Sequence, residues 1–368
     1  MADLNFIPVP VEQLRALCMD VFQKLGTTHE NARIITDVTL AADLRGIDSH
    51  GVGRLGFYVN YIRQGVIKLQ AQPEVVYETP ISALIDAHDG MGQPVSHQAM
   101  QLAIRKAEET GIGLVTVRSS NHYGIAGYYA MMALEKDLIG SSMTNASVFV
   151  SPTFGRDAMM GTNPIAVAVP CGEERPWVMD MATSIVPFGK LETYDRLGKE
   201  LPLGWVTDET GQPSSDPLRV MTNLRSQPVR GGMLPLGGFG ELMGGHKGYG
   251  LVTLVDILCG VLPGAFYANL VNPHGPDGTP LPAGLGHFFA ALRIDAIRPV
   301  AEFKAGMDDL VRRLRGAPKA EGCDRIYIHG EKEYESTERR QREGVPLSPR
   351  LHAELCEIAR EFNAPFPA

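Results

Sequence analysis

The sequence has few cysteines, no long apolar run and no block of like charge. Its five cysteines are scattered over 368 residues without a CxxC pair, which argues against a disulfide framework and against a structural zinc site. No apolar run approaches the roughly 20 residues that a membrane helix needs. A formal charge of -8 without a basic cluster argues against nucleic acid or an anionic membrane as a partner. A small molecule is therefore the expected partner.

The chain also lacks the common nucleotide and zinc signatures. No GxGxxG motif follows a predicted strand with an acidic residue about 20 positions later. Neither GxxxxGKS/T nor HExxH occurs. A Rossmann enzyme, a P-loop enzyme and a zincin are therefore all disfavoured.

The start of the chain, MADLNFIPVP, has neither the basic nor the apolar region of a secretory signal, so we expect a cytoplasmic protein. Hydrophobic residues make up 44% and charged residues 21% of the chain, which is typical of a globular protein. A length of 368 residues predicts two or three domains.

Hydrophobic periodicity predicts a helical start, an α/β middle and a mostly helical end. At the start we expect three helices, namely residues 10–25, a second one opened by a capping box of Thr27 and Glu30 and ended by Gly46, and a third from within DSHG to about Gln64. In the middle we expect strands at VVY, SALIDA, GLVTV, SSMTN, IAVAV and FFAALRI, between helices at residues 95–110, 128–136 and about 248–262. At the end we expect a helix around residues 308–314, a strand at RIYIH, and helices at residues 334–342 and 349–362. The pattern predicts a mixed α/β fold.

The stretch RGIDSHGVGR, residues 45–54, contains more polar and charged side chains than a turn needs. If the third helix starts near Ser49, the helical period places on one face the residues His50, Arg54, Tyr58 and Tyr61. That face is either a solvated surface or a site. Glycine costs up to about 1 kcal/mol inside a helix, so Gly51 and Gly53 favour a site that a ligand or another backbone approaches closely.

Four further motifs place polar groups next to apolar runs. SNHYG puts His122 at the end of a predicted strand, where α/β sheets bind ligands, although a lone histidine there is more often structural. GTNP, residues 161–164, is an Asn-Pro turn with or without a function. MDMATS, residues 179–184, ends an apolar run with a carboxylate and two hydroxyls. GGHKGYG, residues 244–250, opens a helix with glycines and Lys247, which suits a phosphate group but is a common pattern.

Taken in order, RGIDSHGVGRL, SNHYGIAGYYA, GTNPIAVAVP, MDMATS and GHKGYGL resemble the malate/L-lactate dehydrogenase family of the non-Rossmann type. The resemblance extends from about Val11 to Phe362. The family also contains sulfolactate, ureidoglycolate and diketogulonate oxidoreductases and a reductase of cyclic imino acids. Five motifs in a fixed order are far more specific than any one of them.

The resemblance implies roles for individual residues. His50 is expected to donate and accept the proton, with Ser49 beside it and Arg54 as the contact for the substrate carboxylate. In some members the histidine matching His122 has the acid–base role instead, so both remain candidates. Further substrate contacts are expected from Tyr58, Thr162 and Asn163. The expected cofactor-binding residues are Asp180, Met181, Ala182, Thr183, Ser184, His246, Lys247, Gly330 and Glu331. No metal site is expected.

The resemblance also implies a homodimer, NAD or NADP as the cofactor, and a division of the chain. It implies a non-Rossmann NAD(P)-binding α/β domain within residues 76–299 and a mainly helical domain built from residues 1–75 and about 300–368. Two positions depart from the family pattern. Met160 stands where many members have a tyrosine, near the substrate, and His329 stands where many have a proline, near the adenosine end of the cofactor.

The expected reaction transfers a hydride between nicotinamide and C2 of a small 2-hydroxy or 2-oxo carboxylic acid. A histidine, with an ordinary pKa of about 6.5, can exchange the proton near neutrality, and an arginine binds the adjacent carboxylate through two hydrogen bonds. Within the family, the alternative is an NADPH-dependent reductase of a cyclic imino acid. Outside it, the alternatives are a metal-dependent hydrolase with His50, His122 and His246 as ligands, and a non-catalytic α/β binding protein. The residues alone leave open which acid is the substrate and whether NAD or NADP is used.

Overall fold

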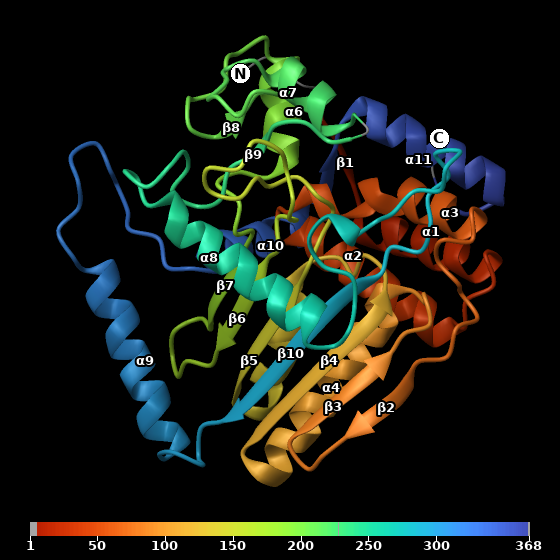
Figure 1. The fold of residues 1–368 in the computed structure, drawn as a ribbon. Helices are drawn as coiled ribbons and strands as arrows, with labels where there is room; N and C mark the ends of the chain where they lie inside the picture. Colours follow the sequence, from red (N-terminus) through yellow and green to blue (C-terminus); the bar gives the residue numbers. More distant parts are fainter. Residues whose placement is uncertain (1–5, 227, 367–368) are drawn as a thin grey trace.

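The computed structural model describes residues 6–226 and 228–366 and has a mixed α/β architecture around one large sheet (Figure 1). Its seven strands lie in the order β2-β3-β4-β10-β5-β6-β7. The pair β3 and β4 is parallel, and every other neighbouring pair is antiparallel. The strands are β2 Glu74–Glu78, β3 Ser82–Asp86, β4 Ile112–Ser120, β5 Leu138–Thr144, β6 Ile165–Val169, β7 Trp177–Met181 and β10 Leu285–Arg293. The mixed α/β class and the strands predicted in the middle of the chain are confirmed.

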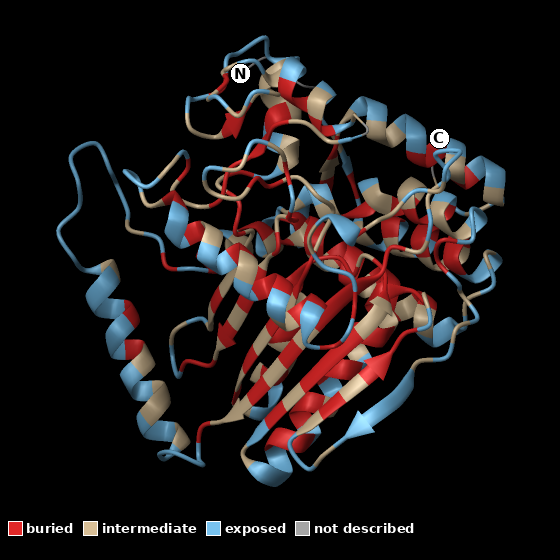
Figure 2. Cartoon of the chain, viewed as in Figure 1, coloured by how far each residue is buried: buried red, intermediate tan, exposed pale blue. Residues whose placement is uncertain are grey.

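Helices cover both faces of the sheet, so its central strands are buried (Figure 2). On one face lie α4 Gly92–Thr110 and α5 Ala126–Met132, and on the other lie α8 Gly245–Asp256 and the π-helical turn Ile257–Val261. A Cβ on Gly113 of β4 would be 1.9 Å from Ala103 O of α4. A Cβ on Gly286 of β10 would be 1.7 Å from Cys259 O on the other face. Glycine therefore lets both helical layers pack directly on the central strands.

The two ends of the chain fold together beside the sheet (Figure 1). The strand β1 Ile7–Val9 pairs antiparallel with β11 Val345–Leu347. Four helices share one apolar core with this pair, namely α1 Val11–Lys24, α2 His29–Leu44, α3 Leu55–Arg63 and α11 Pro349–Phe362. The first five residues, part of the start in which we expect no secretory signal, lie outside the described residues.

The remaining elements pack around the edge strand β7 and above it. Here lie α6 Phe188–Arg196, β8 Val206–Thr207, α7 Pro217–Leu224, β9 Gly232–Met233, α9 Val300–Arg315 and α10 Glu331–Glu343. The helix α9 contacts Trp177 of β7 through Met307 and Val311. The helices predicted at the end of the chain are thus confirmed, and two of them are longer than expected. Across the described residues, no helix combines the length and the apolarity needed to cross a bilayer.

The prediction of a third helix starting near Ser49 is wrong. The chain forms two 3-10 turns, Asp48–His50 and Val52–Arg54, and α3 begins only at Leu55. Between the turns the Gly51 backbone is extended, and the Val52 N–H donates to Asp43 Oδ2 at 2.8 Å. A Cβ on Gly51 would be 1.8 Å from Asp43 Oδ1. A carboxylate of α2 therefore requires this glycine, so the expected close approach of a ligand or another backbone is corrected at Gly51 to that of the Asp43 side chain.

Two smaller predictions are also wrong. The cap of α2 lies one residue later than expected, because Thr28 Oγ1 accepts from the Asn31 N–H at 3.2 Å. The segment RIYIH forms no strand. Its His329 O accepts from the Val178 N–H at 3.2 Å, but the Ile328 N–H donates to the Glu331 carboxylate at 3.0 Å. A side chain thus takes the donor that a strand ladder would need.

Candidate active site

Two histidines from distant parts of the chain meet beside α3. His50 lies in the first 3-10 turn and His122 follows β4, and their rings stack with centroids 5.3 Å apart and an interplanar angle of 26°. Both side chains are half-buried. The Asn121 amide donates to Asp89 O at 2.9 Å and to Gly90 O at 3.0 Å, which fixes the loop that carries His122. The fold therefore brings together the two candidate acid–base residues.

Arg54 lies close to both imidazoles and keeps a free guanidinium edge. Its Nε donates to Ser49 O at 2.7 Å, and its guanidinium lies 5.7 Å from the centre of the Phe57 ring. Ser49 Oγ in turn lies 2.8 Å from His50 Nδ1. Within residues 6–226 and 228–366, Arg54 forms no ion pair with a carboxylate. It is thus free to bind the carboxylate of a ligand.

A buried arginine from the far end of the chain holds this turn in place. Arg340 of α10 donates from Nη1 to Asp43 O at 2.6 Å and also to Asp48 Oδ1. Asp43 itself holds the next turn through the Val52 N–H. The position of His50 therefore depends on α2 and α10 together.

Tyr58 lies in the interior, whereas the helical wheel placed it on an open face. It is 1% exposed, and its hydroxyl is 2.8 Å from His122 Nδ1. The Gly124 N–H also donates to this Nδ1, at 3.4 Å. Tyr58 thus contacts His122, and its burial does not favour the predicted contact with substrate.

Burial and neighbouring positive charge favour neutral imidazoles. Burial, and then Arg54, lower the pKa of His50 to about 4. Burial lowers the pKa of His122 well below its ordinary value, and His50, Arg54 and His287 lower it further. An anion bound at Arg54 would offset part of this effect, so ligand charge and imidazole protonation are coupled here.

The predicted cofactor residues on α8 lie at an exposed helix start. His246 and Lys247 are exposed in its first turn, directly after Gly244 with a φ of +89°. A Cβ on Gly248 would be 2.1 Å from Leu236 O, so the preceding loop packs against this turn. Lys247 forms no ion pair with any residue that the structure describes. An unpaired cation at a helix N-terminus fits the pyrophosphate of a dinucleotide.

The other predicted cofactor segments lie along β7, next to the same loop. Leu236 N–H donates to Thr183 O at 2.9 Å, which joins the end of β7 to the approach of α8. A Cβ on Gly330 would be 3.3 Å from Val178 N, so the turn before α10 lies against β7 as well. The fold therefore brings the three segments around one strand, although they lie far apart in the sequence.

Asp180 connects this region to the histidines. Its Oδ2 accepts from the Gly127 N–H at 2.8 Å, five residues after His122. Burial raises the pKa of Asp180 to about 6, opposed by the Gly127 N–H and by Arg45, while Glu333 adds to the rise. The carboxylate thus connects β7 with the start of α5 and lies near Arg45 at the end of α2.

Asn163 and Thr162 hold the backbone in the structure. Asn163 is fully buried, and its amide donates to Val252 O at 3.0 Å and accepts from the Ala146 N–H at 3.2 Å. Thr162 O accepts from the Thr183 N–H at 2.9 Å. The Asn163 amide is therefore occupied on both sides, which does not favour the predicted contact with substrate.

Several predicted cofactor residues likewise use the polar atoms of their side chains for bonds within the protein. Ser184 Oγ donates to Val186 O at 2.8 Å. The Glu331 carboxylate accepts from Arg315 at 2.7 Å and from Arg325 at 2.9 Å. Of the rest of this set, the half-buried ones are Asp180, Met181 and Ala182. Ser184 and Glu331 shape the region, and their polar atoms are not open to a ligand.

Two buried polar residues near the site were not predicted. His287 on β10 is fully buried, with Nδ1 2.7 Å from Thr144 Oγ1 and Nε2 2.8 Å from Ser120 Oγ. A histidine inside the apolar run GHFFAALRI was a signal for it. Gln93 on α4 is also fully buried, and nothing in its sequence context marks it.

Comparison with known proteins agrees with the resemblance of the motifs. The profile of the family described as "Malate/L-lactate dehydrogenase" matches residues 9–356. A malate dehydrogenase of Pyrococcus abyssi is 45% identical over 98% of this chain and 96% of its own. A malate/(S)-sulfolactate dehydrogenase of Methanothermus fervidus is 37% identical over 96% of this chain and 97% of its own. The crystal structure of a malate dehydrogenase from Entamoeba histolytica superposes with a TM-score of 0.94, at 37% identity, over 99% of this chain and all of that one.

Proposed function

The chain belongs to the malate/L-lactate dehydrogenase family of oxidoreductases, and from this we propose that it interconverts malate and its 2-oxo acid with a nicotinamide cofactor. The observation that carries the proposal is the stacked pair His50 and His122 beside the unpaired Arg54. The 45% identity to a malate dehydrogenase favours malate over the other acids of the family. Membership in this family also leaves the metal-dependent hydrolase and the non-catalytic binding protein without support.

Arg54 supplies the anchor for the substrate. A guanidinium binds a carboxylate through two parallel hydrogen bonds, which fixes the orientation of the acid as well as its position. The C1 carboxylate on Arg54 would bring the C2 oxygen toward the imidazoles, because Arg54 Nε donates to Ser49 O at 2.7 Å and Ser49 Oγ lies 2.8 Å from His50 Nδ1. The bound nicotinamide supplies or accepts the hydride at C2.

An imidazole of this pair exchanges the proton on the C2 oxygen. In the free protein the lowered pKa of His50, about 4, leaves a neutral ring that can accept the proton of a 2-hydroxy acid. A carboxylate bound at Arg54 cancels part of the positive charge that lowers this pKa. Binding of the 2-oxo acid therefore favours the protonated ring that reduction requires.

We propose that the end of β7 and the start of α8 bind the cofactor. The supporting features are Lys247 at the exposed helix start and the convergence of the segments at Asp180 and Gly330. The segments at Asp180 and Lys247 belong to a non-Rossmann NAD(P)-binding α/β domain within residues 76–299, and the segment at Gly330 comes from the second domain. A mainly helical domain of residues 1–75 and about 300–368 then completes the chain, which agrees with the pairing of β1 with β11.

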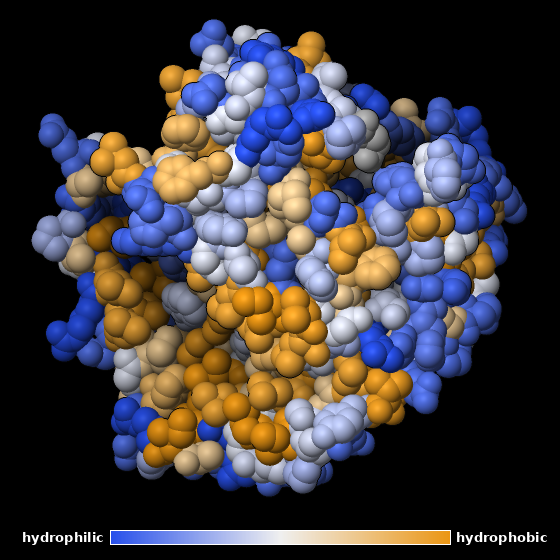
Figure 3. Space-filling model, in the orientation of Figure 1, coloured by the Kyte–Doolittle hydropathy of each residue, from blue (hydrophilic) through white to orange (hydrophobic). Residues whose placement is uncertain are grey.

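We also propose a homodimer in the cytoplasm. An apolar surface extends over the outer side of α8 and the segment after it (Figure 3), with the exposed residues Leu251, Leu254, Ile257, Val261, Leu262, Phe266, Tyr267 and Leu270. Contiguous apolar surface of this kind is typical of subunit contacts. The thiols of Cys18, Cys171, Cys259 and Cys323 are free, which agrees with a reducing compartment.

An activity panel tests the function. The purified protein is given NADH or NADPH with oxaloacetate, pyruvate, sulfopyruvate or a cyclic imino acid, and oxidation of the cofactor is followed by absorbance. We expect the highest kcat/KM with oxaloacetate. A protein that is folded by circular dichroism but oxidises neither cofactor with any of these compounds would contradict the proposal, and a preference for the imine would replace malate with the imino-acid alternative.

A further inference from the structure

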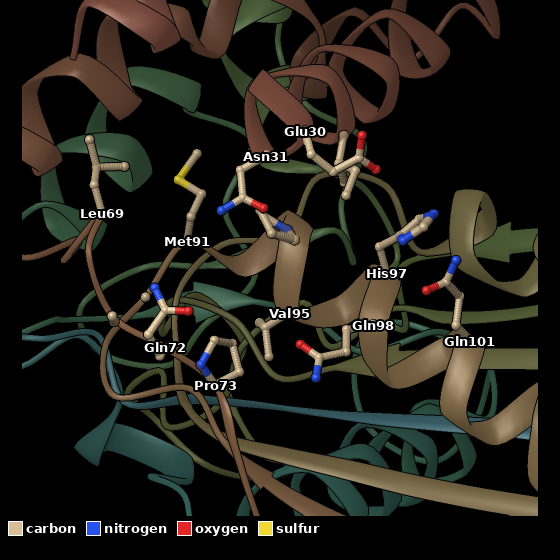
Figure 4. A pocket seen from close by; sticks show the side chains of 14 residues that line it. Glu30, Asn31, Leu69, Gln72, Pro73, Met91, Val95, His97, Gln98 and Gln101 are labelled. Carbon is tan, nitrogen blue, oxygen red and sulfur yellow. The ribbon is translucent and has the colours of Figure 1, made fainter. Parts of the chain in front are cut away.

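Gln93 is a buried amide that lies near a hydroxyl but forms no well-aligned hydrogen bond within the described fold. It lies in the first turn of α4 and is fully buried, and neither Nε2 nor Oε1 forms a well-aligned bond with a described residue. Its neighbours Met91 and Pro94 line a surface cavity of about 290 Å³ (Figure 4), whereas Gln93 does not. A buried unpaired amide is costly, so its inward position needs a reason.

The packing of α4 places this amide beside Tyr58 and the loop of His122. A Cβ on Gly92 would be 2.3 Å from Asn121 O and 2.6 Å from His122 O, so the helix start lies directly on this loop. Burial raises the pKa of Tyr58, and the amide of Gln93, after Arg54, opposes that rise through the phenol oxygen. Gln93 therefore faces the hydroxyl that contacts His122, and it can donate to the phenol oxygen.

His122 Nδ1 faces two donors, which decides where the ring carries its proton. The Gly124 N–H can only donate, and it points at Nδ1 at 3.4 Å. The Tyr58 hydroxyl lies 2.8 Å from the same atom. A nitrogen that accepts an N–H bond has no proton of its own, so the neutral ring is protonated at Nε2. This Nε2 forms no hydrogen bond with the described part of the chain.

The hydrogen bond at Nδ1 of His50, unlike those at Nδ1 of His122, does not fix where the ring carries its proton. Its Nδ1 faces the hydroxyl of Ser49 at 2.8 Å, and a hydroxyl can donate or accept. His50 can therefore gain and lose a proton without losing this bond. Protonating His122 at Nδ1 would set its N–H against the N–H of Gly124.

We propose that His122 acts as a fixed, neutral hydrogen-bond donor from Nε2 to the C2 oxygen of the substrate, with Tyr58 and Gln93 as positioning residues, and that His50 alone exchanges the proton. The inference rests on the proposed dehydrogenase function and divides its chemistry between the two histidines. A neutral donor stabilises the charge that develops on C2 oxygen as the hydride arrives at C2. The proton on the product hydroxyl then comes from His50, and His122 keeps its own.

The surroundings of His122 agree with this division. The titratable or charged groups that face it are His50 and Arg54 from the turns, Tyr58 from α3 and His287 from β10. None of these carries negative charge near neutrality, because burial raises the pKa of Tyr58. A positive charge on His122 would have no counterion in this set.

Nuclear magnetic resonance of the protein labelled with 15N at histidine tests the tautomer without any substrate. We expect one ring, identified by its loss in His122→Gln, to be protonated at Nε2 and to stay neutral down to the acid limit of the fold. A His122 ring that is protonated at Nδ1, or that titrates near neutrality, would overturn the inference. The tautomer and its titration are measured in the wild-type protein, and the variant serves only to identify the signals of His122.

Kinetics of matched glutamine variants test the division of roles. A glutamine amide can donate a hydrogen bond but cannot titrate. We expect His122→Gln to lose roughly tenfold in kcat and to keep the pH profile, and His50→Gln to lose on the order of a hundredfold or more and to lose the pH-dependent limb. His274→Gln, in an exposed loop, is the control. Loss of the limb in His122→Gln with its retention in His50→Gln would reverse the assignment.

The positioning role has its own variant pair. Tyr58→Phe removes one donor to Nδ1, so we expect kcat to fall on the order of tenfold with a much smaller change in KM, and the NMR signals to show a mixture of tautomers. Tyr128→Phe is the control, since its half-buried hydroxyl forms no hydrogen bond with the described residues. An unchanged tautomer in Tyr58→Phe would overturn the positioning role. Failure of the wild type to reduce any 2-oxo acid would instead refute the proposed function, while the NMR result stands separately.

Discussion

Asp43 of α2 accepts the N–H of Val52 at 2.8 Å, and this bond shapes the turn that carries His50. The contact leaves no room for a side chain at Gly51, where a Cβ would be 1.8 Å from Asp43 Oδ1. The turn is thus built by a contact between α2 and the backbone, and its shape is not a local property of the sequence DSHG.

We expect Gly51→Ala to destabilise the protein by on the order of 1–3 kcal/mol, because the new methyl group must displace a buried carboxylate. Activity should fall as well, since His50 is adjacent. Gly53→Ala is the matched control, because its Cβ would meet Leu351 Cδ2 at an ordinary 3.6 Å. Urea unfolding measures both variants. Equal stability of the two would show that Asp43 moves aside without cost.

Replacing Arg54, the proposed anchor for the substrate carboxylate, should affect substrate binding more than folding. In Arg54→Lys the paired hydrogen bonds to the C1 carboxylate are lost, and KM for the 2-oxo acid should rise about tenfold or more. Arg63→Ala is the control, because Arg63 lies at the far end of α3 and contacts Glu361 and the Phe362 ring, away from the two histidines. A KM that is unchanged in a folded Arg54→Lys protein would remove Arg54 from the substrate site.

The helices and strands were largely predictable, whereas their arrangement was not. Hydrophobic periodicity located α11 and the middle strands, because an element that buries one face has apolar residues at a fixed local spacing. The insertion of β10 between β4 and β5 pairs Phe289 with Val115 and with Ser142, which lie far away in the chain. Such long-range pairing leaves no local signal.

The same limit applies to the candidate site. The motifs identified His50, His122 and Arg54, which the fold brings together. The contact of Tyr58 with His122 depends on the packing of α3 against the loop after β4, so a helical wheel misplaced it. No sequence signal identified Gln93, since its proposed positioning role depends on the close approach of α4 to that loop.

Acid should destabilise the protein through its buried neutral histidine. Burial lowers the pKa of His287 to about 3, against about 6.5 in an unfolded chain. The unfolded state therefore binds the proton first, and stability is full above pH 6.5 and falls as the pH drops toward 3. Each pH unit in this window should cost up to about 1.4 kcal/mol for this ring.

The comparison of wild type with His287→Gln over that pH range isolates the effect. Urea unfolding should show a flatter pH dependence in the variant, whatever its stability at pH 7. His274→Gln, on the surface, should keep the wild-type slope. Parallel slopes for wild type and His287→Gln would mean that the ring is not held neutral in the folded protein.

Binding at the proposed cofactor site should depend on the salt concentration. Lys247 is exposed, unpaired within the described chain and located in the first turn of α8, so Lys247→Ala should weaken NADH or NADPH binding by roughly tenfold. The loss should shrink as salt rises, because an exposed charge is screened. Lys199→Ala, another exposed lysine, should bind as the wild type does. Fluorescence titration measures the affinities, and a salt-independent difference would point to a structural effect of the substitution instead.

The apolar surface on α8 predicts which substitution dissociates the proposed dimer. Leu254 is 42% exposed and Ile257 is 47% exposed on this helix and the turn after it, and an exposed apolar face of this extent is stabilised by a partner. A charge placed there would be buried without a counterion in a dimer, so Leu254→Asp should shift the protein toward monomer at equal concentration. Leu218→Asp on α7 replaces an equally apolar and more exposed leucine, at 60%, outside this surface and should leave the assembly unchanged. Light scattering after size-exclusion chromatography gives the mass of each variant. A wild-type monomer would refute the proposed dimer. A dimer that survives Leu254→Asp and dissociates in Leu218→Asp would place the subunit contact away from α8.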